Sequence, residues 1–300
     1  MDLEPRVGYK DVLPALRAYM VASRVYGCIR NNKADLMRYL LTARVLALAL
    51  VIILIACANA ASVYAAENQP LRVAVAADMR FAFEEIVVAF RKERPEIQVS
   101  ASYGSSGNFY AQLSNRAPFD LFLSADVDYP RRLIREGRAL AESEFIYGVG
   151  QIVVWVPQTS TVDVEKLGIQ ALLDPSVRKI AIANPRYAPY GRAAEAAMKS
   201  LGVYEKVKDR LVLGDSIIQT AQFVESGAAE IGIISHSLTL RSPLAGKGRS
   251  WIVPLDAYPR REQGGVILSW TEHREAAEAL RAFVLSDKGK AILRSYGFSE

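Results

Sequence analysis

A short polar segment, SYGSSGNFYAQL at residues 102–113, has the composition of an anion-binding loop. Small residues, among them Ser105, Ser106 and Gly107, lead directly into an amphipathic stretch. The first N–H groups of a helix have no partner within the helix, and together with serine hydroxyls they can bind an anion. The same composition is also typical of a flexible surface loop. One loop supplies only part of a site, so the other elements must provide the rest.

From residue 71 onward, β-rich runs alternate with helical patterns, which predicts an α/β protein with parallel sheets. The pattern restarts after a long apolar strand at 145–157. We therefore expect two lobes, each a mostly parallel sheet flanked by helices, with a ligand in the cleft between them. The predicted boundaries are 71–150 plus 256–300 for lobe 1 and 151–255 for lobe 2, with hinges near 148–152 and 253–257.

Four predicted helices begin directly after strands, and all four openings should lie at the carboxyl ends of the strands. The openings at Asp78 and in GSSG belong to lobe 1, and those before Tyr190 and at Ser216 belong to lobe 2. Each offers unpaired N–H groups and about half a positive charge. A small dianion between two such pairs would gain the several hydrogen bonds per oxygen that its desolvation requires. Most helices that follow strands bind no anion, however, so architecture alone leaves both interpretations open.

Five segments resemble the periplasmic molybdate-binding proteins of ABC importers. They are VAVAADMRFAFEEI, YGSSGNFYAQL, APFDLFLSADVDYPRRL, ANPRYAPYGRAAEAAM and LRSYGF, within about residues 71–298. The resemblance implies a two-lobe type II periplasmic-binding fold that closes on molybdate or tungstate and delivers it to a membrane permease. Such proteins are not enzymes, so it implies no catalytic residue, no cofactor and no metal apart from the bound molybdate. We also expect a monomer.

Carried over by motif, the resemblance places oxyanion contacts at the helix openings. Ser106 matches a contact made through hydroxyl and amide, Tyr190 matches an amide contact with a phenol contact in some members, and Ile217 matches a contact made by the amide alone. Weaker candidates are Ser105, Ser216 and Ser235. Ser235 falls where some members have a ligand-binding tyrosine, and Tyr190 can stand in for that phenol.

Asp78 departs from the family pattern, because the best-known members have a serine there. We include it among the candidate ligand-binding residues, with two orientations open. In the favoured one, Asp78 turns away from the ligand and caps its own helix. In the other, it faces the ligand and accepts a hydrogen bond, which suits a protonated anion such as hydrogen phosphate and disfavours molybdate or sulfate.

Two alternative functions remain. The first is a binder of phosphate or sulfate on the same fold. The second is an exported hydrolase, with Ser235 beside His236 or with Asp126 and Asp128 as its reactive groups. Neighbouring residues on a strand point to opposite faces, and no His or Cys cluster completes a metal site around the aspartates, so the sequence disfavours an enzyme.

The positive charge of the chain is concentrated at its beginning. Residues 1–66 contain eight basic and four acidic residues, whereas the other 234 residues contain 29 basic and 28 acidic ones. A nearly neutral body lacks the concentrated basic face that nucleic-acid binding requires. We therefore expect no nucleic-acid partner.

Residues 37–66 have the order of a secretory signal peptide: two arginines, an apolar run and small residues. The apolar run is about a dozen residues long, short of the roughly 20 that a spanning helix requires. We expect export to the periplasm. The sequence LIAC, which ends at Cys57, also resembles a lipoprotein signal, and lipidation there would anchor the protein to a membrane. Residues 1–36 form an N-terminal extension of unknown role.

Overall fold

The computed structural model describes residues 37–38, 40–48, 50 and 69–299. The chain divides into two units, Met1–Gln69 and Pro70–Glu300. Residues 37–38, 40–48 and 50 of the first unit are helical, and no helix in the described part of the chain is long and apolar enough to cross a membrane. The predicted extension at 1–36, most of the predicted signal peptide at 37–66 and its Cys57 lie outside the described residues.

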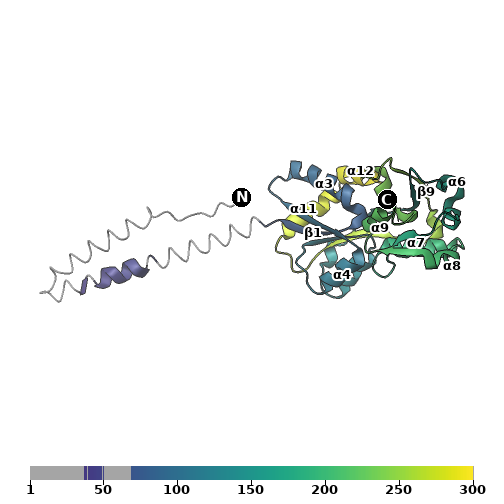
Figure 1. Ribbon diagram of the computed structural model, residues 1–300. Coiled ribbons are helices and arrows are strands. Elements are labelled where there is room, and N and C mark those ends of the chain that lie inside the picture. The colour runs from purple at the N-terminus through teal and green to yellow at the C-terminus, as the bar shows by residue number, and fades with distance from the viewer. Residues whose placement is uncertain (1–36, 39, 49, 51–68, 300) are drawn as a thin grey trace. The chain divides into compact units, whose positions relative to one another are not determined.

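Two five-stranded sheets form the framework of the second unit (Figure 1). The first has the order β2–β1–β3–β10–β4 and the second the order β7–β6–β8–β5–β9. The strands of the first sheet are β1 (Leu71–Ala76), β2 (Val99–Gly104), β3 (Leu121–Ser124), β4 (Phe145–Val149) and β10 (Glu262–Ile267). Those of the second are β5 (Ile152–Pro157), β6 (Ile180–Ala183), β7 (Leu211–Gly214), β8 (Ile231–Ser235) and β9 (Gly248–Ile252).

Each sheet contains one strand that runs against the others. Strand β10 pairs antiparallel with β3 and β4, and β5 pairs antiparallel with β8 and β9. The remaining ladders, β1 with β2 and β3 and β6 with β7 and β8, are parallel. In each sheet the other four strands therefore share one direction, which confirms the mostly parallel sheets. The reversed strands are those that follow the two crossings between the sheets, since the chain leaves the first sheet after β4 and returns to it at β10.

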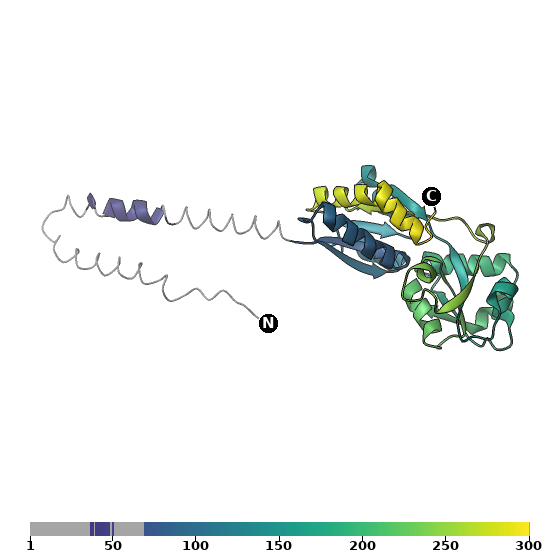
Figure 2. The ribbon, with the colours of Figure 1, turned by 90° about the horizontal axis from the view of Figure 1, so that it is seen from above.

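Helices flank both sheets. Those beside the first sheet are α3 (Arg80–Glu93), α4 (Ser106–Ser114), α5 (Asp128–Arg135), α11 (Arg274–Leu285) and α12 (Asp287–Ser295), with the 3₁₀ turns η1 (Ala77–Met79) and η2 (Ala141–Ser143). Those beside the second are α6 (Val164–Leu167), α7 (Pro189–Ser200), α8 (Tyr204–Val207), α9 (Ile217–Glu225) and α10 (Ser237–Leu240), with η3 (Gly168–Leu173), η4 (Lys208–Arg210) and η5 (Leu255–Ala257). Figure 2 shows the two sets as separate groups, with the C-terminal helices beside α3.

Alternate residues of the central strands pack into different cores. Val73 and Val75 belong to a cluster with α3, α11 and α12, whereas Ala74 and Phe122 belong to a cluster with α4 and α5. All four are fully buried, as expected where a sheet with a period of two residues is covered on both faces. A third cluster fills the second lobe. All three clusters lie within residues 71–298, so the unit Pro70–Glu300 contains its own hydrophobic cores and can fold alone.

We predict that Asp120→Ala destabilises the first lobe. The buried Asp120 carboxylate accepts hydrogen bonds from the Arg72 backbone N–H at 2.7 Å and from the Thr271 hydroxyl at 2.8 Å. Its removal leaves both donors without this acceptor, so the free energy of unfolding should fall by about 1–3 kcal/mol. Urea denaturation of the unit Pro70–Glu300 measures the change. The exposed Asp209→Ala variant should match the parent within about 0.5 kcal/mol, and equal losses in both variants would contradict the prediction.

Candidate functional site

A small cavity lies where the two lobes meet, beside residues that directly follow β1, β2, β3, β6 and β7. It encloses about 210 Å³ of empty space, part of which opens to solvent. Both lobes contribute to it, as expected for a ligand site between lobes. Its lining residues are Ala76, Ala77, Asp78, Gly104, Ser105, Ser106 and Ala125 from the first lobe and Ala188, Pro189, Tyr190 and Ile217 from the second.

Three helix N-termini reach this cavity. Ser106 is the first residue of α4, Tyr190 the second residue of α7, and Ile217 the first residue of α9. Backbone N–H groups at these positions have no carbonyl partner within their own helix. The partial positive charge of each helix end also points toward the cavity. No lysine or arginine is among the described residues that line it.

Asp78 also lines the cavity, but its side chain does not cap a helix, so the predicted cap is wrong. A 3₁₀ turn intervenes between β1 and α3, and Asp78 lies inside this turn. The N-cap positions of the turn and of α3 are Ala76 and Met79, and neither makes a side-chain cap. Asp78 Oδ2 instead accepts hydrogen bonds from the Tyr190 hydroxyl at 2.8 Å and from Gln263 Nε2 at 2.9 Å.

Burial controls the protonation of this cluster. Asp78 is 2% exposed, and burial raises its pKa from 3.8 to about 6, although the hydrogen bonds from Gln263 and Tyr190 limit the rise. Burial, together with the Asp78 charge, raises the pKa of Tyr190 well above that of an ordinary tyrosine. The Tyr190 hydroxyl therefore stays protonated and can act as a donor.

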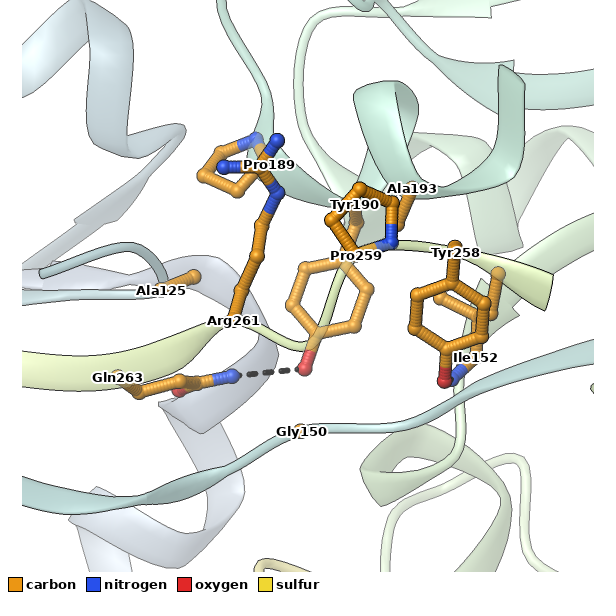
Figure 3. Close-up of a pocket in the computed structure, with 10 residues that line it drawn as sticks. All are labelled: Ala125, Gly150, Ile152, Pro189, Tyr190, Ala193, Tyr258, Pro259, Arg261 and Gln263. Atoms are coloured by element: carbon orange, nitrogen blue, oxygen red, sulfur yellow. Dashed lines mark hydrogen bonds between the residues drawn. The ribbon is translucent and has the colours of Figure 1, made fainter. Parts of the chain in front are cut away.

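Gln263 was missed by the sequence analysis. Its amide donates to Asp78 and, at 2.9 Å, to the Tyr190 hydroxyl oxygen (Figure 3), and its side chain is buried. Nearby Gly150 makes this arrangement possible, because a Cβ atom there would lie 2.0 Å from the Tyr190 hydroxyl oxygen and 2.4 Å from Gln263 Nε2. The only signal in the sequence is a polar residue in an otherwise buried strand, EQGGVI, and such a residue does not reveal its partners.

The two serines of the GSSG loop differ in their hydrogen bonds. Ser106 Oγ accepts a hydrogen bond from the Ala125 N–H at 2.9 Å, which leaves its hydroxyl hydrogen available to a ligand. Ser105 Oγ is buried without a partner among the described residues, as are Asp78 Oδ1 and Gln263 Oε1. Buried polar atoms without partners are uncommon, and two of these three, in Ser105 and Asp78, belong to residues that line the cavity.

Further contacts hold the lobes together around the cavity. The Gly107 N–H of the first lobe donates to the Tyr187 carbonyl of the second at 2.9 Å. Ser237 of the second lobe donates through its hydroxyl to the backbone carbonyl of Asp78 at 2.8 Å. Arg192 of α7 forms an ion pair with Asp126 of the first lobe at 2.8 Å. The structure thus shows the two lobes closed on each other.

Comparisons with known proteins agree with this geometry. Residues 71–299 match the family described as bacterial extracellular solute-binding protein. The chain belongs to this family. Its resemblance to molybdate-binding proteins is also confirmed. The molybdate-binding protein ModA of Azotobacter vinelandii is 36% identical over 234 residues, which cover 78% of this chain and 91% of that protein.

Two further comparisons concern the same class of solute-binding protein. The molybdate-binding protein ModA of Rhodobacter capsulatus is 37% identical over 227 residues, which cover 75% of this chain and 86% of that protein. The solved structure of the Azotobacter vinelandii periplasmic molybdate-binding protein matches with a TM-score of 0.72 and 31% identity, covering 77% of this chain and 99% of that one. This likeness confirms the two-lobe type II fold.

Of the seven residues predicted to bind the ligand, the structure brings five to the cavity of this solute-binding protein: Asp78, Ser105, Ser106, Tyr190 and Ile217. The other two do not line it. Ser216 caps α9, since its hydroxyl oxygen accepts from the Gln219 N–H at 3.3 Å. Ser235 Oγ lies 2.7 Å from Ser237 Oγ. That the five residues contact an anion stays a prediction.

The groups considered for hydrolysis have structural partners. The half-buried His236 ring contacts the Thr239 hydroxyl at 3.1 Å. Asp126 is bound by two arginines, Arg192 at 2.8 Å and Arg261 at 2.7 Å. The described residues contain no group of three or more His, Cys, Asp or Glu that could hold a metal ion. The relatives are likewise solute-binding proteins, which is consistent with a chain that is not an enzyme.

The buried Asp78 predicts a specific pH dependence of stability. The pKa of Asp78 is about 6 in the folded protein, above the ordinary aspartate value of 3.8 that applies to the unfolded chain. The contribution of Asp78 to stability is therefore complete below pH 3.8 and is lost as the pH rises through 6. Asp78→Asn removes this loss. We expect the variant to be more stable than the parent at pH 7.5 by an amount on the order of 2–3 kcal/mol, and to lose that advantage near pH 4. Urea denaturation of the ligand-free unit at both pH values measures the difference, and a pH-independent difference would contradict the assignment.

Proposed function

We propose that this chain captures molybdate outside the cytoplasm and delivers it to the permease of an ABC transporter. The observation that carries the proposal is the convergence of three helix N-termini from both lobes on one cavity without a basic lining residue. Membership of the extracellular solute-binding family supports capture of a solute outside the cytoplasm. The two relatives at 36% and 37% identity, both named as molybdate-binding proteins, support the choice of ligand.

The proposed contacts are neutral donors. The backbone N–H groups of Ser106, Tyr190 and Ile217 and the hydroxyls of the GSSG loop would surround the oxygens of a tetrahedral dianion. Hydrogen bonds to an ionised acceptor are stronger than neutral ones, so such a shell can replace the water that a dianion loses on binding. Tungstate has the same charge and shape, and we propose it as a second ligand. Molybdate is the cargo here, and no cofactor takes part.

Capture and delivery would use the hinge between the lobes. Each lobe supplies only part of the donor shell, so closing the lobes completes it. Contacts between the lobes, such as the one between Gly107 and Tyr187, would stabilise the closed, ligand-bound form. The permease would recognise this closed form, which we propose to be a monomer. We further propose that residues 37–66 direct export to the periplasm, with a lipid anchor at Cys57 as the alternative to release.

A second candidate ligand is hydrogen phosphate. The observation that favours it is the position of Asp78, whose carboxylate lines the cavity. An ionised carboxylate can accept a hydrogen bond from a protonated anion but repels a fully deprotonated one. The two candidates therefore predict opposite results in a direct competition between anions.

The first test is calorimetric titration of the unit Pro70–Glu300 at pH 7 with molybdate, tungstate, sulfate and phosphate. We expect one-to-one binding of molybdate and tungstate and no heat from the other two. Binding of phosphate with molybdate silent would favour the second candidate. If none of the four anions binds, the oxyanion-binding function is wrong.

The second test removes one hydroxyl from the cavity. Ser106→Ala should weaken molybdate binding by about 10- to 100-fold, because a hydrogen bond to a charged acceptor contributes about 1.5–3 kcal/mol. The matched control is Ser216→Ala, which also removes a serine hydroxyl at a helix start, but one that serves as a cap. The control should lower the melting temperature while its Kd stays within about twofold of the parent. Equal losses of affinity in both variants would contradict the assignment of Ser106.

A further inference from the structure

Asp78 has an unusual place among the residues of the cavity. Of the described residues that line it, Asp78 is the one that carries a carboxylate, and no basic side chain faces it across the cavity. If Asp78 were ionised, a bound oxyanion and the carboxylate would lie in the same buried space as two like charges. Their repulsion is strong where water is excluded.

The hydrogen bonds of the two Asp78 oxygens are unequal. Oδ2 accepts from both Tyr190 and Gln263, whereas no side chain among the described residues donates to Oδ1. An ionised carboxylate is an acceptor only, and so are the oxygens of a fully deprotonated anion. A proton on Oδ1 removes the repulsion and supplies a donor without disturbing the two bonds to Oδ2.

Among the described residues, those that hydrogen-bond to the Asp78 side chain carry no positive charge. Tyr190 from α7 and Tyr147 from β4 are the titratable side chains close to it, and the negative charge of Asp78 helps to raise the pKa of both. Gln263 from β10 is neutral, and Ser237 from α10 donates to the Asp78 backbone carbonyl. Because the pKa of the Asp78 carboxyl without an anion is about 6, protonating it at neutral pH costs little free energy.

Two arginines near the cavity, Arg192 and Arg261, are paired with another carboxylate. Arg192 and Arg261 both form ion pairs with Asp126, at 2.8 Å and 2.7 Å. Arg261 lines a neighbouring pocket on the hinge side of Tyr190 (Figure 3) and is not among the residues that line the anion cavity.

We propose, building on the oxyanion-binding function above, that Asp78 couples anion capture to the uptake of one proton. The closed site holds a fully deprotonated tetrahedral dianion with Asp78 neutral, and Oδ1–H donates a hydrogen bond to an anion oxygen. The proton comes from solvent on binding and returns to solvent on release. A protonated anion such as hydrogen phosphate would instead bind with Asp78 ionised and with no proton uptake.

Calorimetry of the unit Pro70–Glu300 with molybdate, in two buffers of different ionisation enthalpy, counts the protons taken up. We expect the uptake to rise with pH and to approach one proton per anion at pH 8, because the carboxyl without an anion loses its proton over this range. Over the same range the affinity should fall by about 10- to 100-fold. Binding with no proton uptake at pH 8 would overturn the proposal.

Two variants locate the proton. Asp78→Asn is neutral and keeps an N–H donor, so it should bind molybdate with no proton uptake and with an affinity that stays within about twofold from pH 6 to pH 8. The matched control Asp120→Asn changes another buried carboxylate of the first lobe, one bonded to Arg72 and Thr271 away from the cavity. It should keep the proton uptake of the parent. Uptake that persists in Asp78→Asn would overturn the assignment to Asp78.

A spectroscopic measurement decides the case if Asp78→Asn does not bind. The carbon-13 chemical shift of the Asp78 carboxyl, measured in the parent at pH 8, should report an ionised group without molybdate and a protonated one with it. An ionised Asp78 in the complex would overturn the proposal. Failure of the parent to bind molybdate at all is a different result, since it contradicts the proposed function and not the role of Asp78.

Discussion

The buried carboxylate of Asp78 is the interaction on which the arrangement of the two lobes depends. It lies in the first lobe and accepts hydrogen bonds from Tyr190 of the second lobe and from Gln263 on β10, the strand that follows the return crossing. Burying a carboxylate is costly unless donors replace its water. Three separate parts of the chain must therefore meet at this point, and the glycine at 150 leaves the space for them to do so.

The site separates neutral donors from basic side chains. Helix N-termini and hydroxyls line the cavity, whereas Arg192 of the second lobe and Arg261 of the first bind Asp126, and their side chains remain 27% and 28% exposed. A buried basic residue would attract any anion, including the abundant ones, and would itself have to be desolvated. Oriented N–H groups select instead by the positions and protonation of the anion's oxygens. The ion pairs can then hold the lobes together without competing for the ligand.

The two-lobe fold and several of the cavity-lining residues could be predicted from the sequence. The alternation of strands and helices predicts two lobes, and residues directly after strands must meet at one edge of each sheet, which places Ser106, Tyr190 and Ile217 at the cavity. Gln263 and Ser235 could not be placed in this way. Gln263 reaches the site because β10 inserts between β3 and β4, a long-range pairing that no local pattern encodes, and Ser235 turns to Ser237.

Asp78 shows why local rules fail where tertiary contacts are strong. An aspartate between a strand and a helix is a good N-cap by its local sequence, since its carboxylate can accept from the first free N–H groups. Here two donors from distant parts of the chain, Tyr190 and Gln263, both bind Oδ2 and hold the side chain in a buried space. The helix begins without a side-chain cap, which costs stability at that end. The lost cap therefore lies beside a cavity, where departures from local sequence rules are expected to concentrate.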